Sequence, residues 1–228
     1  ILDSLQWLGL EYDEFHRQSE RAPEHKKYLK KLIDEGFAYI SKEEAPSGAP
    51  ENKDRRKEVI RFKNPNIKVS FKDLIRGEIE VDTTDLKDFV IAKDLDTPLF
   101  HLAVVADDFD MGVTHVVRGE DNISNTPRQI LIQRAIGAPE PVYAHLPLIL
   151  APDRTKLSKR KGALAITEYR ERGYLPEAIL NYLALLGWNP GTEQEILTKN
   201  DLLAQFDISK VQKGGAIFNE EKLRWVNK

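Results

Sequence analysis

Residues 114–150, THVVRGEDNISNTPRQILIQRAIGAPEPVYAHLPLIL, alternate between strand-like and helix-like segments. The stretch from Thr114 to Arg118 predicts a buried strand, and 142–150 predicts a second one. Between them, Thr126-Pro127 is expected to begin a helix, because threonine can cap it and proline suits its first turn. Another helix is expected just upstream, over 101–109. The order helix, strand, helix, strand is typical of an α/β layer with parallel strands.

The pattern changes on both sides of this stretch. Upstream, apolar spacing predicts helices over 1–8 and 24–35. Short strands are expected over 37–40, 59–63, 67–71, 78–81 and 89–91, with a loop over 45–57. Downstream of Ile166 only helices are expected, over 166–173, 175–187, 198–206 and 219–227, the last capped by Asn219. We therefore predict an α/β core, an inserted α+β module and a helical tail.

The composition excludes several protein classes. Of 228 residues, 41% are hydrophobic and 31% charged, which is unlike collagen-like, disordered or membrane-spanning chains. No membrane partner is predicted, because the longest apolar stretch, Ala178 to Trp188, is far shorter than the ~20 residues of a membrane helix. The absence of cysteine excludes disulfides, iron–sulfur clusters, thiol nucleophiles and cysteine-ligated zinc, and it predicts a cytoplasmic location.

Charge is distributed unevenly along the chain. The net charge is −3, yet residues 22–77 carry 14 Lys and Arg against 9 Asp and Glu, and 78–110 carry 10 acidic residues against 2 lysines. Five of the eight residues in 154–161 are basic. This asymmetry is compatible with a phosphate-rich partner, although taken by itself it favours charged faces that only meet solvent.

The basic segment Lys156 to Gly162 is the strongest candidate for chemistry. It follows a predicted buried strand, and open α/β sheets bind ligands beyond the carboxyl ends of their strands. Flexible lysines suit the moving charge of a nucleotide triphosphate, although a solvated turn or a nucleic-acid contact would have the same composition. His101, His115 and His145 lack metal-ligand spacing, so we predict core or rim positions for them and no metal site.

Residues 156–160, KLSKR, resemble the KMSKS signature of class I aminoacyl-tRNA synthetases, in the form found in glutamyl-tRNA synthetases. The resemblance extends to residues 7–10, 18–21, 116–121, 124–127, 144–149, 173–178 and 181–188, and it is weakest over 41–57. The family's HIGH-type signature and its anticodon-binding domains find no counterpart in the sequence. With Met111 as its only methionine and no secretory leader, the chain is interpreted as a central fragment, inactive alone. Ile40-Ser41-Lys42 replaces the cysteine knuckle of some relatives, so no zinc is expected.

The resemblance implies a fold and a division into domains. The expected fold is a partial Rossmann-like class I synthetase core with an inserted α+β acceptor-binding module and an α-helical stem-contact domain. Residues 1–21 would end the first half of the core, 22–99 would form the inserted module, 100–151 the second half, and 152–228 the KLSKR loop and the helical domain.

The resemblance also implies a reaction. A glutamate–tRNA ligase activates L-glutamate with ATP, accompanied by Mg²⁺, and transfers it to the 3′ end of tRNA(Glu); the enzyme is expected to be a monomer. Two alternatives remain open. The chain could instead belong to an enzyme like glutamyl-queuosine tRNA(Asp) synthetase, although the 174–188 helices and the Lys156–Gly162 loop favour the first interpretation. It could also act as a non-catalytic tRNA-binding module.

Individual roles follow from matching positions in the family. Lys159 is the expected catalytic residue, supported by Lys156. ATP is expected to contact Lys159, Ser158, Asn122 and the main chain of Leu148 and Ile149. The amino acid is expected to contact Arg118, which would bind its γ-carboxylate, together with Asp121, Phe100 and Val104.

Each of these assignments has a structural alternative. Arg118 could form a salt bridge with Asp107 or Asp108, and Asn122 could cap a helix. Phe100 and Val104 replace a tyrosine and an asparagine of many relatives, which removes polar contacts, and both could simply be core residues.

Overall fold

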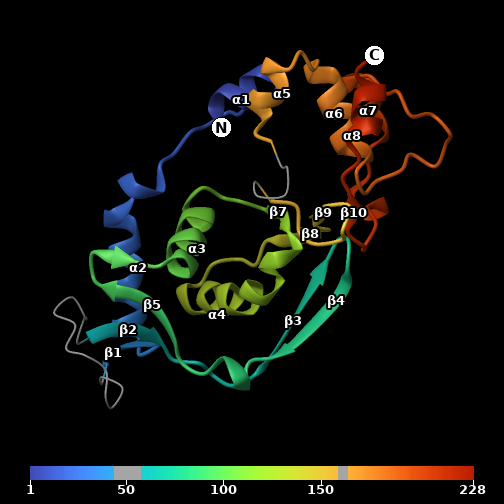
Figure 1. Cartoon of the computed structure of the whole chain (residues 1–228). Coiled ribbons are helices and arrows are strands. Elements are labelled where there is room, and N and C mark those ends of the chain that lie inside the picture. The colour runs from blue at the N-terminus through green and yellow to red at the C-terminus, as the bar shows by residue number, and fades with distance from the viewer. Residues whose placement is uncertain (44–57, 159–163) are drawn as a thin grey trace, which may run out of the picture.

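The computed structural model describes residues 1–43, 58–158 and 164–228 (Figure 1). Its helices are α1 (Leu2–Trp7), α2 (Ala22–Asp34), α3 (Phe100–Asp110), α4 (Thr126–Ile136), α5 (Ile166–Glu171), α6 (Pro176–Leu185), α7 (Lys199–Gln205) and α8 (Glu220–Val226). Its strands are β1 (Ala38–Lys42), β2 (Glu58–Phe62), β3 (Lys68–Asp73), β4 (Gly77–Asp82), β5 (Phe89–Asp94), β6 (Thr97–Pro98), β7 (His115–Gly119), β8 (Val142–Leu146), β9 (Ile149–Leu150) and β10 (Ala216–Ile217). The loop expected over 45–57 lies outside the described residues.

The sheet that positions the candidate site has the strand order β4-β3-β8-β7. Strands β7 and β8 are parallel, as predicted, and Arg118 lies opposite His145 in their register. The antiparallel hairpin β3–β4 adds to this sheet, because β3 pairs in parallel with β8 at Asp73 and Tyr143. A hairpin from the predicted inserted module therefore shares a sheet with the strands of the α/β core.

Helices α2, α3 and α4 form the main core together with the two four-stranded sheets. Strands β1, β2, β5 and β6 form the second sheet, which is antiparallel. Figure 1 shows α3 and α4 next to each other, and both bury apolar side chains in one cluster with α2 and β8. Leu29, Leu102 and Ile130 of the three helices are completely buried in it.

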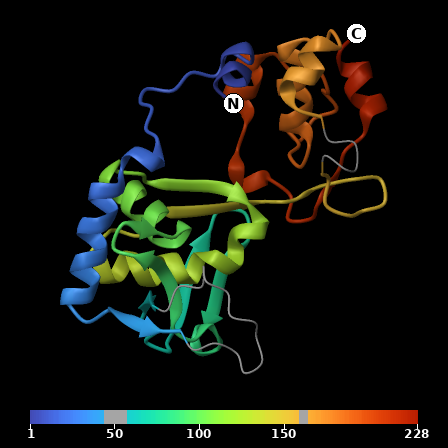
Figure 2. The same cartoon turned by 60° about the vertical axis from the view of Figure 1, so that its left-hand side comes forward.

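The C-terminal segment forms a smaller helical cluster that includes the N-terminus. Leu8 packs with Tyr169, Ile179 and Leu223. Figure 2 shows α1, in dark blue, beside the orange and red helices of this cluster. Within the described residues, no helix has the length and apolar character needed to cross a membrane.

Three predictions about strands were wrong. The strand over 114–118 was expected to be buried, but β7 lies at the edge of its sheet and contains no buried residue, and Val117 is 52% exposed. The strand expected over 142–150 is divided into β8 and β9 around Pro147, which has no N–H to donate to a ladder. The region after Ile166 is not purely helical, because β10 pairs in parallel with β9. The main-chain N–H groups of Ala216 and Phe218 donate to the carbonyls of Leu148 and Leu150, at 3.0 and 2.8 Å. So short a strand depends on its partner and has no period of its own to detect.

Candidate active site

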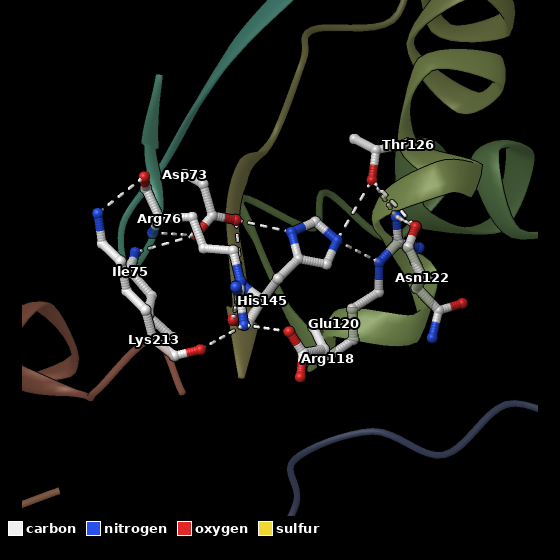
Figure 3. A network of polar contacts seen from close by, with 9 residues as sticks. All are labelled: Asp73, Ile75, Arg76, Arg118, Glu120, Asn122, Thr126, His145 and Lys213. Atoms are coloured by element: carbon white, nitrogen blue, oxygen red, sulfur yellow. Dashed lines mark hydrogen bonds and ion pairs between the residues drawn. The ribbon is translucent and has the colours of Figure 1, made fainter. Parts of the chain in front are cut away.

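Arg118 lies near the carboxyl end of β7, where the sheet meets α4 (Figure 3). Its Nε donates to Nε2 of His145 at 3.2 Å, and its Nη2 donates to Oγ1 of Thr126 at 2.8 Å. Its guanidinium carbon lies 5.6 Å from the centre of the Tyr143 ring. Burial lowers the pKa of Arg118, but a guanidinium keeps its charge in proteins. Arg118 thus places a partly buried positive charge among neutral groups.

The salt bridge considered for Arg118 is not what the structure contains. Asp107 binds Arg21 instead, with 2.6 Å between Nε and Oδ1. Burial lowers the pKa of Arg118, and Asp108 acts on it only through its field, which opposes that effect. The helix-capping prediction for Thr126 was also wrong. Asn125 precedes α4 without a side-chain cap, and the Thr126 hydroxyl accepts the hydrogen bond from Arg118.

His145 connects Arg118 to Asp73, and both His145 and Asp73 are buried, with exposed fractions of 0% and 1%. Oδ2 of Asp73 lies 2.6 Å from Nδ1 of His145 and accepts from its main-chain N–H at 3.0 Å. Oδ1 accepts from the main-chain N–H groups of Ile75 and Arg76, at 3.0 and 2.9 Å. Burial alone would raise the pKa of Asp73, but these hydrogen bonds lower it below its usual value. Asp73 is therefore ionised at neutral pH.

Burial lowers the pKa of His145, and this effect outweighs the hydrogen bond with Asp73, which raises it. The charges of Arg118 and Arg76 lower the pKa further. The imidazole is therefore neutral at pH 7. Because the Asp73 carboxylate can only accept, we assign the single ring proton to Nδ1, which leaves Nε2 as the acceptor for Arg118.

Arg76 and Glu120 form an outer ring around these residues. Arg76 forms an ion pair with Glu120, and it exchanges hydrogen bonds with Lys213 at 3.1 and 3.2 Å. Glu120 Oε1 accepts from the main-chain N–H of Leu148 at 2.9 Å. Three segments far apart in sequence are thereby joined: the β3–β4 turn, the turn after β7 and the chain that leads to β10.

The KLSKR segment approaches the turn after β7 through its first lysine. Nζ of Lys156 lies 2.6 Å from Oδ2 of Asp121, and this hydrogen bond lowers the pKa of the Asp121 carboxyl. Leu157 N–H donates to the carbonyl of Ile149 at 2.9 Å. Lys156 and Asp121, both predicted site residues, are therefore in direct contact. Ser158 is exposed, and Lys159 lies outside the described residues.

The other predicted ATP contacts, Asn122, Leu148 and Ile149, lie in the same region. Asn122 is in the turn after β7, where its Oδ1 accepts from Nδ2 of Asn125 at 3.1 Å. The main chain of Leu148 is fully used within the protein, because its N–H donates to Glu120 and its carbonyl accepts from Ala216. Ile149 is 37% exposed.

The first turn of α3 carries the remaining predicted residues. Phe100 is half exposed, and its ring lies 5.6 Å from that of His101. Val104 falls on the same helix face one turn later and packs partly against the main core. Burial lowers the pKa of His101, and the positive charges of Arg128 and Arg118 lower it further. The field of Arg118 therefore reaches the first turn of α3.

Sequence reasoning did not find Asp73, Arg76 or Glu120, and it assigned His145 only a core or rim position. One local signal existed, because Asp73 lies between the predicted strand over 67–71 and Gly77, which is typical of a turn closed by an aspartate side chain. Its contact with His145 joins residues 72 positions apart and has no local signature. Among the described residues, no group of three or more histidine or acidic side chains could hold a metal ion.

Comparison with known proteins identifies the fold. The family described as "tRNA synthetases class I (E and Q), catalytic domain" matches residues 1–47 and 41–225. The chain belongs to this family. Solved structures of relatives confirm the fold class predicted for this class I synthetase. The synthetase is similar to a solved glutamate-tRNA synthetase from Elizabethkingia anophelis. The TM-score is 0.85 and the identity 31%, over 98% of this chain and 58% of that one.

A second solved relative is a glutamate tRNA ligase from Elizabethkingia meningosepticum in complex with its amino acid. It has a TM-score of 0.84 and 30% identity, over 99% of this chain and 57% of that one. Among curated proteins, the synthetase is 46% identical to a glutamate–tRNA ligase of Aquifex aeolicus and 44% identical to one of Carboxydothermus hydrogenoformans. All of this chain is covered in both alignments, but only 54% and 55% of those proteins. The chain spans about half the length of these relatives.

Proposed function

We propose that the protein acts as a glutamate–tRNA ligase, which activates L-glutamate with ATP and transfers it to the 3′ end of tRNA(Glu). The proposal rests on the environment of Arg118. Its partners His145 and Thr126 are neutral, and no carboxylate in the described residues forms an ion pair with it. A partly buried guanidinium without a counter-ion attracts a carboxylate, which it can bind through two parallel hydrogen bonds. The side-chain carboxylate of glutamate fits this requirement.

The proposed reaction needs no covalent intermediate on the protein. An α-carboxylate oxygen of glutamate attacks the α-phosphorus of ATP, the bond to pyrophosphate breaks, and an acyl adenylate forms. A ribose hydroxyl of the tRNA then attacks the acyl carbon, and AMP leaves. Positioning and charge stabilisation would provide most of the acceleration.

The residues near the KLSKR segment would hold and stabilise ATP. We propose Lys159 as the catalytic residue and Lys156 as its support, with Ser158 and Asn122 beside the nucleotide and the main chain of Leu148 and Ile149 near the base. Lys156 is already placed by Asp121, so its ammonium lies beside the turn after β7. Asp121 would border both the nucleotide and the amino acid, and Phe100 and Val104 would line the amino-acid pocket.

Mg²⁺ would arrive bound to ATP rather than in a protein site. The nearby carboxylates of Asp121 and Glu120 are engaged by Lys156 and Arg76, and the described residues contain no cluster that could hold a metal. Magnesium commonly binds through substrate phosphates in this way, and there it neutralises phosphate charge. We expect no zinc in the protein.

The tRNA would contact the module over 22–99 and the helical domain over 152–228. Helix α2 supports this proposal, because Lys27 and Lys30 are exposed on the side opposite its buried residues. Lysines on one helix face suit backbone phosphates, so the affinity for tRNA should fall steeply with salt. We further propose that the protein works as a monomer in the cytoplasm.

ATP–pyrophosphate exchange with the complete gene product, L-glutamate and tRNA(Glu) tests the proposal. Replacing Arg118 with alanine removes a charge-assisted contact worth about 1.5–3 kcal/mol, so the KM for glutamate should rise roughly 10- to 150-fold while that for ATP stays near wild type. The control is Arg134→Ala, because Arg134 lies on α4 and forms an ion pair with Glu140 at the protein surface. The proposal fails if the wild-type protein shows no glutamate-dependent exchange, or if Arg118→Ala uses glutamate normally.

A further inference from the structure

A chain of hydrogen bonds runs from the β3–β4 turn to the guanidinium of Arg118 through the buried side chains of Asp73 and His145. It begins at Asp73, passes through His145 and ends at Arg118, where Thr126 joins it (Figure 3). We propose that Asp73, His145 and Thr126 are positioning residues that hold Arg118 in the orientation that binds the substrate carboxylate. This inference rests on the proposed function and names residues outside the predicted site that determine its specificity.

The first step is the fixed environment of Asp73. Its two oxygens face four N–H groups: those of the Ile75 and Arg76 main chain, and the main chain and ring of His145. Only an ionised carboxylate satisfies four donors, because an amide at this position would turn its own NH2 toward two of them in either orientation. Asp73 therefore requires the proton of His145 to be on Nδ1.

The second step is the acceptor that this tautomer creates. With the proton on Nδ1, the lone pair of Nε2 faces Nε of Arg118 and the hydroxyl of Thr126, each at 3.2 Å. The opposite tautomer would place an N–H against the N–H of an arginine, which cannot accept. Asp73 thus acts on Arg118 through His145, without touching it.

The third step is the geometry of the guanidinium. Nε and one N–H of Nη2 point along the same edge of an arginine, and here they are used by His145 and Thr126. The carbonyl of Asn122 lies 3.5 Å from Nη2, which is too long for a strong bond. The other edge, formed by Nη1 and the second N–H of Nη2, is the fork that can bind a carboxylate through two hydrogen bonds.

Ring packing restricts the same groups. The ring of Tyr143 is stacked on that of His145, with centroids 6.0 Å apart and planes 12° from parallel. The guanidinium of Arg118 lies over Tyr143, whose hydroxyl is bonded to Gln133. His145 and Arg118 are also register partners in the parallel strands β7 and β8. The sheet therefore sets the distance between them, and the hydrogen bonds set the rotation.

Two substitutions of His145 separate the contacts of its ring. His145→Asn places an amide near the position of Nδ1, so it keeps the contact with Asp73 and loses the acceptor for Arg118. His145→Gln reaches the position of Nε2, so it keeps that acceptor and loses Asp73. In glutamate-dependent ATP–pyrophosphate exchange by the complete gene product, we expect His145→Asn to raise the KM for glutamate about tenfold or more. We expect His145→Gln to recover most of that loss, and the KM for ATP to stay unchanged in both.

Thr126→Val provides a test that does not depend on replacing a buried ring. Valine has the shape of threonine without the hydroxyl, so the fold should survive, as thermal unfolding will check. The KM for glutamate should rise several-fold at unchanged kcat, and Thr126→Ser should restore it, because serine keeps the hydroxyl that accepts from Arg118.

The outcomes distinguish this inference from the proposed function. If wild-type protein lacks glutamate-dependent exchange, the proposed function fails and the inference with it. If wild-type protein is active but Thr126→Val binds glutamate normally, only the positioning role is contradicted. Equal losses for glutamate and ATP, or a loss in kcat alone, would indicate a general structural role and would also contradict it.

Discussion

The carboxylate of Asp107, on α3, binds three side chains from α2 and the segment just before it. Its side chain accepts from Nε of Arg21 at 2.6 Å, from Nε2 of Gln18 at 3.2 Å, and lies 2.7 Å from Nε2 of His25. Burial alone would raise the pKa of Asp107, but the hydrogen bonds of Arg21, His25 and Gln18 together lower it below its usual value. The ionised form is thus the one that the fold stabilises.

Two substitutions of Asp107 should differ in cost. Asp107→Ala leaves His25, which is 2% exposed, without an acceptor, and leaves Arg21 with only Asp110 at 2.8 Å. Removing one partner of a buried pair costs about 3–5 kcal/mol, and the remaining Asp110 contact favours the lower end, about 3 kcal/mol. Asp107→Asn keeps an oxygen for Arg21 and His25. It loses the extra strength of charge-assisted bonds and the acceptor that Oδ2 offers to Gln18, so we expect a cost of about 1–2 kcal/mol.

Urea unfolding of the complete gene product at pH 7.5, followed by circular dichroism, measures both costs. The expected order of midpoints is wild type, then Asp107→Asn, then Asp107→Ala. Asp108→Asn is the matched control, because burial raises the pKa of Asp108 and its charged form is therefore disfavoured in the folded protein. This control should cost little or nothing. A loss below about 1 kcal/mol for Asp107→Ala, or equal losses for the two asparagine variants, would refute the reasoning.

Two further predictions concern stability. The pKa values of His145 and Asp73 are both lowered by folding, so the unfolded chain binds more protons and stability rises with pH. The urea midpoint should therefore fall as the pH drops from about 7.5 to about 5.5, a range that includes the histidine pKa of the unfolded chain. His145→Gln should make this fall smaller. Part of the fall should remain in that variant, because the pKa of His101 is also lowered. Thr198 caps α7 by accepting from the Asp201 N–H at 3.1 Å. Thr198→Ala should cost about 1 kcal/mol in urea unfolding and Thr198→Ser much less, and equal midpoints for the two would contradict a capping role.

The sequence by itself determined the elements whose signals are local. The strand β7 and the helix α4 were predicted close to their observed bounds, and the start of β8 was predicted at Val142, because side-chain periodicity, Pro127 and Gly137 act within a few residues. Asn219 was predicted as the cap of the last helix, and its Oδ1 does accept from the Lys222 N–H at 3.0 Å. Family motifs are local in the same sense, so the class I synthetase fold could be predicted from them.

The tertiary structure alone decided which side chains meet. The Thr126 hydroxyl could cap a helix, but in the folded protein it accepts a hydrogen bond from Arg118 instead. No residue close to Thr126 in sequence indicates this contact. Asp73 comes from a hairpin 45 positions before Arg118, and it contacts His145, the partner of Arg118, because β3 pairs with β8. Strand pairing between distant segments is chosen by the free energy of the whole sheet, which no short window of sequence contains. The residues that orient Arg118 are therefore visible only in the folded chain, whereas Arg118 itself could be named from its motif.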